Sequence, residues 1–295
     1  MSDQPTRSTT AGRVFLTLRK KALSEGKSTD EFLQLDALEA FVERLSMSER
    51  AGNFTLKGGV LLSAYDVRRP TRDVDLSCHA LPNAEGLLEG VIGEIGSVSL
   101  DDGWAFTTAG AEAIREDAAY SGVRVAMRGS LGRARQEFHV DVSFGDPIVP
   151  APHPVSLERL LGGRVMVMGY PLSMVFAEKL ITAQQRGTAN TRWRDYVDVF
   201  LLSRAHPMQG EVLIDSLAQV ASARGTTPRL LSSGIEGYAA LARGKWAAWV
   251  RRQKLDERVP VMFAEVLEAV VAFADPAMDG SALGCAWDPN GRCWT

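Results

Sequence analysis

Residues 57–78 of this chain read KGGVLLSAYDVRRPTRDVDLSC. The stretch begins with a glycine pair, Gly58 and Gly59, continues through a helix-like segment, and ends in a strand that carries Asp73 and Asp75. Alternate residues of a strand point to the same face of a sheet, so these two carboxylates lie side by side. Two carboxylates at such a short distance repel one another, and the repulsion raises the pKa of at least one of them unless a cation lies between them. Mg²⁺ favours such oxygen ligands together with substrate phosphates, so the stretch predicts a magnesium site on a strand.

The glycine pair adds a phosphate site to this prediction. Backbone N–H groups next to glycine can approach a phosphate closely, and the N-terminus of the helix expected over residues 60–67 favours negative charge. A carboxylate pair and a phosphate cradle within one short unit are the design of a nucleotidyl-transfer site. A glycine pair or a DxD motif alone is weak evidence, because sugar-transferring enzymes also use DxD.

A third carboxylate, Asp141, lies in the apolar run FHVDVSF at residues 138–144. An aspartate inside such a strand is costly to bury unless it is paired or bound to a metal. The alternative is an aspartate on the water-facing side of an edge strand, which strand alternation also allows. The glycine pair and the two upstream aspartates favour the functional interpretation.

Hydrophobic periodicity and turn residues predict an α/β first half and a helical second half. The expected strands span residues 54–57, 72–77, 104–108, 123–127, 137–144 and 165–168. The expected helices span residues 13–21, 29–45, 60–67, a segment capped by Asn83, 172–185, 192–204, 210–224, 228–255 and 260–273. We therefore predict an α/β (α+β) fold in two domains, with a mixed sheet flanked by helices in residues 1–165 and a C-terminal helical bundle in residues 166–295.

The composition excludes several other classes of protein. The 295 residues are 45% hydrophobic, which is enough for a large core. A formal net charge of −3 gives no overall basic field, so contact with nucleic acid requires a local patch. The three cysteines form no CxxC pair, which argues against zinc and for a reducing compartment. The chain has no signal-like apolar core and no run of about 18 apolar residues, so we expect a cytoplasmic protein without membrane contact.

Five motifs follow one another along residues 54–202. They are Lys57-Gly58-Gly59, Arg69-Pro70-Thr71-Arg72-Asp73-Val74-Asp75, Val140-Asp141-Val142, Glu178-Lys179-Leu180 and Arg194-Asp195-Tyr196-Val197-Asp198. In this order they resemble the DNA polymerase β-type nucleotidyltransferase superfamily. More narrowly, the chain resembles the AbiEii-type nucleotidyltransferase toxins, including their mycobacterial tRNA-modifying members. The family usually has Ser or Thr where this chain has Val60, so backbone N–H groups carry more of the expected phosphate binding.

The resemblance implies a nucleotidyltransferase core and a role for each motif. Asp73 and Asp75 would hold Mg²⁺ on a nucleoside triphosphate, and Asp141 would complete a second metal site or act as the base. Lys179 would neutralise phosphate charge, and Asp195 would orient Lys179 or the nucleotide. The nucleotide-binding residues would be Lys57, Gly58, Gly59, Arg69 and Thr71. The alternative is that Lys179 is a solvated surface charge and that Asp195 and Asp198 form surface ion pairs with nearby arginines.

The resemblance also implies partners, namely a nucleoside triphosphate, an RNA acceptor such as the 3′ end of tRNA, and a cognate antitoxin. Arg186, Arg192 and Arg194, with Trp193 among them, form a basic and aromatic stretch that suits phosphate contact and base stacking. The alternative places Trp193 in the core beside an ordinary loop. Two other functions stay open: nucleotidyl transfer to a small molecule or a protein hydroxyl, and a non-catalytic module that binds a nucleotide or an antitoxin.

Overall fold

The computed structural model describes residues 6–116, 120–145, 147–189 and 192–295. Contacts between Cα atoms divide the chain into two compact units. Unit 1 comprises Met1–Ala64, Arg68–Gly145 and His153–Gly169, and unit 2 comprises Tyr65–Val67, Asp146–Pro152 and Tyr170–Thr295. The domains 1–165 and 166–295 expected from the sequence stay a prediction. Within the described ranges, no helix is both long and apolar enough to cross a membrane.

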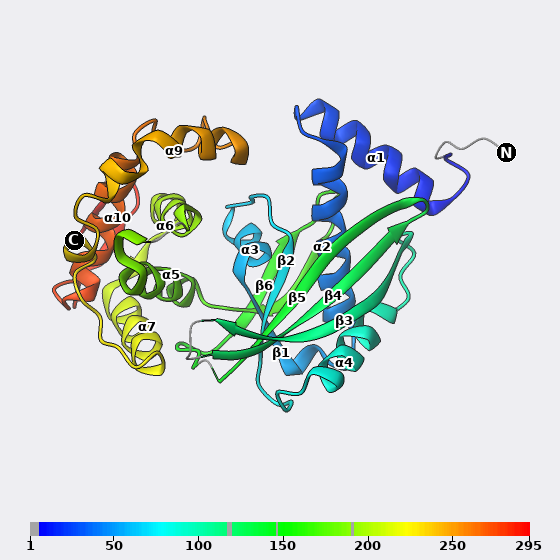
Figure 1. Ribbon diagram of the computed structural model, residues 1–295, viewed down its shortest axis with the longest axis horizontal. Coiled ribbons are helices and arrows are strands. Elements are labelled where there is room, and N and C mark those ends of the chain that lie inside the picture. Colours follow the sequence, from blue (N-terminus) through cyan, green and yellow to red (C-terminus); the bar gives the residue numbers. More distant parts are fainter. Residues whose placement is uncertain (1–5, 117–119, 146, 190–191) are drawn as a thin grey trace. The chain divides into compact units, whose positions relative to one another are not determined.

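Unit 1 is built around a mixed sheet. In the described part of the chain this sheet has seven strands in the order β3-β4-β5-β2-β1-β7-β6. Figure 1 shows β3, β4 and β5 side by side in it. The strands are β1 (Phe54–Lys57), β2 (Asp73–Cys78), β3 (Trp104–Glu116), β4 (Tyr120–Leu131), β5 (Ala134–Phe144), β6 (His153–Glu158) and β7 (Arg164–Gly169). β2 pairs antiparallel with β1 and parallel with β5, so both kinds of ladder meet at its edges. The predicted α/β fold with a mixed sheet is confirmed.

The helices of unit 1 pack against this sheet and fix which face of each strand is buried. α2 (Thr29–Met47) contacts β2, β5 and β7, α4 (Glu85–Ser97) contacts β3 and β4, and α1 (Thr10–Ser24) contacts α2 and β4. Ser28 caps α2 by accepting a hydrogen bond from the N–H of Glu31. Val74, Val140 and Val142 are fully buried in this core. Because side chains alternate along a strand, the aspartates next to these valines point to the opposite face.

The outer strands of the sheet are longer than the hydrophobic pattern predicts. β3 continues past residue 108 through a break in its register with β4, and β4 extends well beyond residues 123–127 at both ends. β6 has no counterpart among the expected strands. Glu112 and Ala113, in the extension of β3, are exposed, so this part of the strand has no buried face whose alternation could reveal it.

The segment after the glycine pair differs from the helix expected over residues 60–67. α3 (Gly58–Leu61) is a single turn that begins at the glycine pair, and a 3-10 turn (Leu62–Tyr65) follows it. A helix of four residues has only a small macrodipole, so the expected phosphate site depends on the individual N–H groups of the turn. The expected cap at Asn83 is also wrong, because Ala84 precedes the first residue of α4 and provides no side-chain cap.

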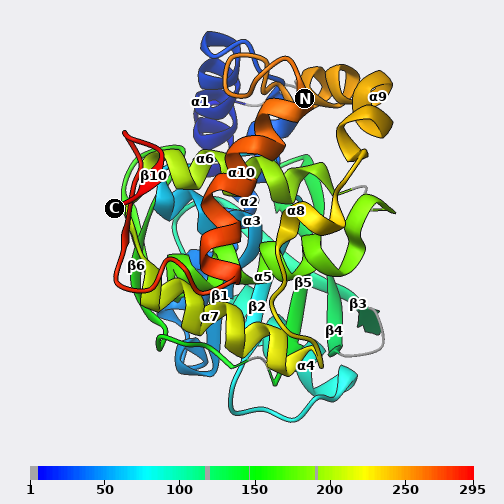
Figure 2. The ribbon, with the colours of Figure 1, turned by 90° about the vertical axis from the view of Figure 1, so that its left-hand side faces the viewer.

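Unit 2 is mainly helical. Its helices are α5 (Leu172–Arg186), α6 (Trp193–Ala205), α7 (Gly210–Ala223), α8 (Leu231–Gly234), α9 (Tyr238–Gln253) and α10 (Phe263–Met278). α10 contacts each of α6, α7, α8 and α9, and α5 contacts α6 and α7 (Figure 2). The helix expected over residues 228–255 is interrupted, because Gly237 adopts a left-handed conformation (φ +75°) between α8 and α9.

A small sheet at the C-terminus of unit 2 was not expected from the sequence. Among the described residues it joins β8 (Met208–Gln209), β9 (Ala286–Asp288) and β10 (Cys293–Trp294). Its tryptophans pack on α10, since the ring of Phe273 stacks with that of Trp294 and meets the edge of Trp287. Strands of two or three residues are too short to show an alternating pattern, so no periodicity could predict them.

Candidate active site

The turn between β1 and α3 requires glycine at its first position. Gly58 has φ +67°, a conformation that other residues rarely adopt. A Cβ atom on Gly58 would lie 1.8 Å from Oδ2 of Asp75, so any side chain would displace that carboxylate. The N–H of Gly59 points toward the same oxygen and donates to it at 3.4 Å. The glycine pair thus lets the backbone pack directly against the carboxylate of Asp75.

The predicted nucleotide-binding residues Arg69 and Thr71 lie on the other side of this turn. A Cβ atom on Gly59 would lie 2.7 Å from Oγ1 of Thr71 and 3.5 Å from Nη1 of Arg69. Glycine therefore permits a close approach at this position too. The structure brings together the glycine pair, the 69–71 loop and the strand that carries Asp75.

Val60 is buried, which explains why this chain tolerates an apolar residue there. Its side chain is 6% exposed and lines a small gap between Leu35 and Leu38 of α2 and a polar side that includes Arg69 and Thr71. The gap measures ≈ 10 Å³, so it accommodates at most about one water molecule. The side chain at position 60 thus packs in the core, and the N–H groups of the turn remain the groups that can approach a phosphate.

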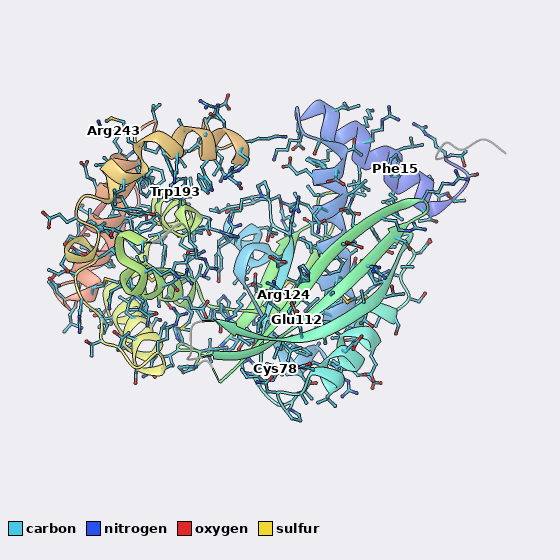
Figure 3. The ribbon with its side chains drawn as sticks, viewed as in Figure 1. Phe15, Cys78, Glu112, Arg124, Trp193 and Arg243 are labelled. Carbon is cyan, nitrogen blue, oxygen red and sulfur yellow. The ribbon has the colours of Figure 1, made fainter. Side chains whose placement is uncertain are left out.

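A row of charged residues crosses the sheet on the face opposite α2 and α4. Lys57 pairs in register with Asp75, Asp75 with Asp141, Asp141 with Arg124, and Arg124 with Glu112. This carboxylate row therefore runs from β1 through β2, β5 and β4 to β3. Figure 3 labels two of its members, Arg124 on β4 and Glu112 on β3. Residues in register on one face of a sheet are direct neighbours, so the two central aspartates repel one another.

The position of Asp75 in this row raises its pKa to about 6. Burial of the carboxyl group is the main cause, and the negative charges of Asp141 and Asp73 add to it. Lys57 and the N–H of Gly59 act in the opposite direction without cancelling the effect. An anion that is difficult to form in the free protein is stabilised by a cation placed against it.

Asp73 and Asp141 each have a basic partner. Arg124 donates from Nε to Oδ1 of Asp141 at 2.8 Å and from Nη2 to Oδ2 at 2.7 Å, a bidentate ion pair that raises the pKa of Arg124 further. Nδ1 of His139 lies 3.2 Å from Oδ1 of Asp73. The carboxylate expected to serve as base or metal ligand is therefore held by a guanidinium in the free protein.

The second group of predicted catalytic residues lies in unit 2, on α5 and α6. Nζ of Lys179 donates to Oδ2 of Asp198 at 2.6 Å and to Oδ1 of Asp195 at 3.4 Å. Nε of Arg192 lies 3.6 Å from Oδ2 of Asp195. The Lys179 side chain is 13% exposed and that of Asp198 is 0% exposed. The interpretation of these groups as solvated surface charges is therefore wrong, because they form a buried ionic cluster.

The three arginines predicted to contact RNA lie around the connection between α5 and α6. Arg186 is in the last turn of α5 and Arg192 is the residue before α6, and both are half-buried, whereas Arg194 is exposed. Trp193 is half-buried and packs against Trp246, Trp249 and Phe263. It thus belongs to an aromatic cluster and also reaches the surface. Contact with RNA stays a prediction.

Comparison with known protein families supports the resemblance seen in the motifs. The family model described as nucleotidyl transferase AbiEii toxin, type IV TA system, matches residues 40–271. This chain belongs to the AbiEii nucleotidyltransferase toxin family. The match covers the glycine pair, the carboxylate row and the Lys179 cluster. The narrower likeness to mycobacterial tRNA-modifying members stays a prediction.

Two solved structures are similar to this AbiEii protein. A candidate nucleotidyltransferase from H. pylori shares 15% identity, with a TM-score of 0.49, over 86% of this chain and 98% of its own. JHP933 from Helicobacter pylori shares 14% identity, with a TM-score of 0.47, over 86% of this chain and 96% of its own. No curated protein sequence matches the chain.

The donor groups of the AbiEii chain fit a divalent cation in one place. Asp73 and Asp75 present oxygen ligands on one face, and the pKa of Asp75 is raised chiefly by burial and then by the neighbouring negative charges of Asp141 and Asp73. Across the described residues, no three Asp, Glu, His or Cys side chains are gathered closely enough to hold a metal ion. The aspartate pair is therefore the candidate metal site, and Asp141, which lies in register with Asp75, is paired with Arg124.

Two neighbours of the predicted site residues, Arg124 and His139, were missed from the sequence, and Asp198 was considered only as part of a motif and as a surface ion-pair partner. Arg124 carried a usable signal, because it lies between Val123 and Val125 as Asp141 lies between two valines. A charged residue in each of two adjacent apolar strands indicates an ion pair across them. Asp198 lies within the RDYVD motif, three residues after Asp195, and so faces the same side of its helix.

Proposed function

We propose that this AbiEii toxin uses Mg²⁺ to transfer a nucleoside monophosphate from an NTP to an RNA acceptor, most concretely the 3′ end of tRNA. Membership of the AbiEii family supports a toxin that acts as a nucleotidyltransferase. The observation that carries the rest is the position of Asp75, which packs against the glycine turn at Gly58 and lies next to Asp141. That arrangement supports a cation and a phosphate at adjacent positions. Modified tRNA would not be aminoacylated, and growth would stop until a cognate antitoxin restrained the toxin.

The residues of unit 1 have distinct proposed tasks. Asp73 and Asp75 would hold Mg²⁺, which neutralises phosphoryl charge and polarises the reacting oxygens when it is bound. Lys57, Arg69, Thr71 and the N–H groups of Gly58 and Gly59 would bind the triphosphate.

Asp141 would accept the proton of the acceptor hydroxyl after it separates from Arg124. The hydroxyl oxygen then bonds to the α-phosphorus, and the bond from that phosphorus to the pyrophosphate oxygen breaks.

Lys179 and Asp195 complete the proposal. Lys179 would neutralise negative charge on the triphosphate or on the pyrophosphate that leaves. Asp195 and Asp198 contact its ammonium group, so they would hold it in position. The basic residues Arg186, Arg192 and Arg194 support an RNA acceptor. Because NTPs and tRNA both occur in the cytoplasm, we propose that the protein acts there.

Labelling of RNA tests the proposal. The purified protein is incubated with Mg²⁺, each α-³²P-labelled NTP in turn and total tRNA, beside Asp75→Asn. Label on tRNA with wild type and none with the variant is the expected result. Label on a small molecule or on protein would move the acceptor to that class, and no transfer to any acceptor would contradict the proposal.

A further inference from the structure

A second candidate site lies between α6 and α9, and all its lining residues belong to unit 2. It is a cavity of ≈ 690 Å³ whose walls include Trp193, Tyr238, Leu241, Lys245, Trp249 and Arg252. This volume is within the range of small-ligand sites, which combine apolar walls with a few polar groups. We propose that the cavity binds one nucleotide of the RNA acceptor, with its base against the indoles and its phosphates at Lys245 and Arg252. This inference rests on the proposed RNA acceptor.

The indoles form a preformed surface for a nucleobase. The Trp249 ring stacks on that of Trp246, with centroids 5.4 Å apart and planes 19° apart, and Trp246 is 2% exposed. Trp193 meets Trp249 nearly at right angles, with centroids 5.9 Å apart. Trp249 is half-buried and reaches the cavity, so a base can stack without rearrangement of the core. Stacking of this kind accepts any base, as suits one acceptor region among many RNA sequences.

The charge of α9 favours a polyanion. Within Tyr238–Gln253 the helix has four basic residues, Arg243, Lys245, Arg251 and Arg252, and no acidic residue. For the portion of the chain that the structure describes, no carboxylate forms an ion pair with Lys245 or Arg252. The chain as a whole has a net charge of −3, so this concentration of positive charge is local. Two uncompensated cations beside an aromatic wall suit a nucleotide phosphate and its base together.

The cavity borders the Lys179 cluster. Burial raises the pKa of Tyr238 to about 12, and the negative charge of Asp195 adds to this rise. Tyr238 thus forms part of the cavity wall and also lies within the electrostatic reach of the cluster. Trp193, another wall residue, lies two residues before Asp195 on α6, and Asp195 contacts the ammonium group of Lys179 that is proposed to act on the triphosphate.

A matched pair of double variants tests the phosphate contacts in the full-length protein. Lys245→Ala/Arg252→Ala removes the two cations of the cavity, whereas Arg243→Ala/Arg251→Ala removes the same charge from the same helix outside it. The probe is a fluorescein-labelled single-stranded 12-nucleotide RNA of mixed sequence, followed by fluorescence anisotropy at several salt concentrations. We expect the slope of log Kd against log salt to fall by about 1.4 for the first pair, at about 0.7 for each phosphate contact, and by less than half of that for the second. Equal falls would indicate diffuse attraction to the helix and overturn the proposal.

The stacking contact has its own test. Trp249→Phe keeps an aromatic ring and Trp249→Leu does not, so the first should bind the RNA probe within about twofold of wild type and the second at least about fivefold more weakly. Circular dichroism checks that both variants are folded. If Trp249→Leu does not fold, RNA should still quench the tryptophan fluorescence of wild type more than that of Trp249→Phe. Equal quenching overturns the proposal.

The same variants separate this inference from the proposed function. If wild type labels RNA and the cavity pair leaves KM for RNA unchanged, the cavity inference fails and the proposed function stands. If the cavity pair loses RNA binding in a protein that labels no RNA, the binding site stands and the proposed acceptor fails. A poly-glutamate peptide that binds the cavity in place of RNA, with no RNA binding, would overturn the inference in favour of an acidic protein partner.

Discussion

The two charged clusters of this protein, one in each unit, are balanced in opposite ways. The carboxylate row of unit 1 contains more negative than positive side chains, and the pKa of Asp75 within it is raised to about 6. In the Lys179 cluster of unit 2, two carboxylates surround one ammonium group, and Arg192 approaches from the side. The first cluster lacks positive charge and so favours an added cation, whereas the second is close to neutral as it stands. Substitutions in the two clusters should therefore have opposite effects on stability.

Asp75→Asn should give the largest change in activity together with a gain in stability. Loss of a metal ligand should lower nucleotidyl transfer by more than about 100-fold, the upper range for changes to groups around a metal site. Asn keeps an oxygen that can accept from the N–H of Gly59 but carries no charge. The free energy of unfolding at pH 7, measured with urea and EDTA, should rise by about 1–3 kcal/mol, since each pKa unit corresponds to about 1.4 kcal/mol.

The pH dependence of this gain follows from the sign of the shift. The folded protein holds the Asp75 proton up to about pH 6, whereas the unfolded chain releases it near pH 3.8, the ordinary pKa of an aspartate. Wild-type stability should therefore decrease as pH rises through this window and stay level above it, and the variant should lack that decrease. Glu257→Gln, an exposed change, serves as the control. A variant no more stable than wild type at pH 7 would show that Asp75 is not under strain in the free protein.

Lys179→Ala should have the reverse effect on stability. It leaves the charge of Asp198, which is 0% exposed, without its ammonium partner. Removing one partner of a buried ion pair costs about 3–5 kcal/mol, so the free energy of unfolding should fall by about that amount. Urea unfolding measures this change. Lys245→Ala on α9 is the control, because that lysine is exposed. The double variant Lys179→Met/Asp198→Asn should recover most of the loss, and a single variant as stable as wild type would mean that water reaches the cluster.

Arg124→Ala tests whether the ion pair with Asp141 competes with Mg²⁺. Freed from its two hydrogen bonds, Asp141 becomes available to a cation, so the Mg²⁺ concentration for half-maximal rate should fall by about 3–10-fold, the equivalent of roughly 1 kcal/mol. The matched control is Arg128→Ala on the same strand, where Arg128 pairs with Glu137 across the same two strands. If the Mg²⁺ requirement changed in both variants or in neither, the ion pair of Arg124 with Asp141 would not compete with Mg²⁺.

The sequence predicted the central features of unit 1 because each leaves a local pattern. The glycine pair, the alternation around Asp73 and Asp75, and the buried valines beside Asp141 are all read within a few residues. What it missed depends on pairing between distant segments. The ion pair of Arg124 with Asp141 exists only once β4 and β5 are in register, and the burial of Lys179 depends on how α6 packs on α5.

The length of α3 was missed for a related reason. The apolar residues after the glycine pair suit either a long helix or a single buried turn, and the choice depends on packing. Leu61 and Leu62 are fully buried, and Asp66 ends the segment in a left-handed conformation (φ 57°). Neither the burial nor the turn has a signature in the local sequence that distinguishes it from a continuing helix.

Val60→Thr should give the smallest effect, and it tests the departure of this chain from the family pattern. Threonine introduces the hydroxyl that the resemblance associates with phosphate binding, but the side chain at position 60 is buried beside Leu35 and Leu38. We expect KM for the NTP to stay within about twofold while the unfolding free energy falls by about 1–2 kcal/mol, because a hydroxyl that replaces a methyl group at this buried position must be removed from water. Leu87→Thr on the exposed surface of α4 is the control for stability. A several-fold drop in KM would instead show that the hydroxyl reaches the nucleotide, so that the phosphate site extends beyond the backbone of the turn.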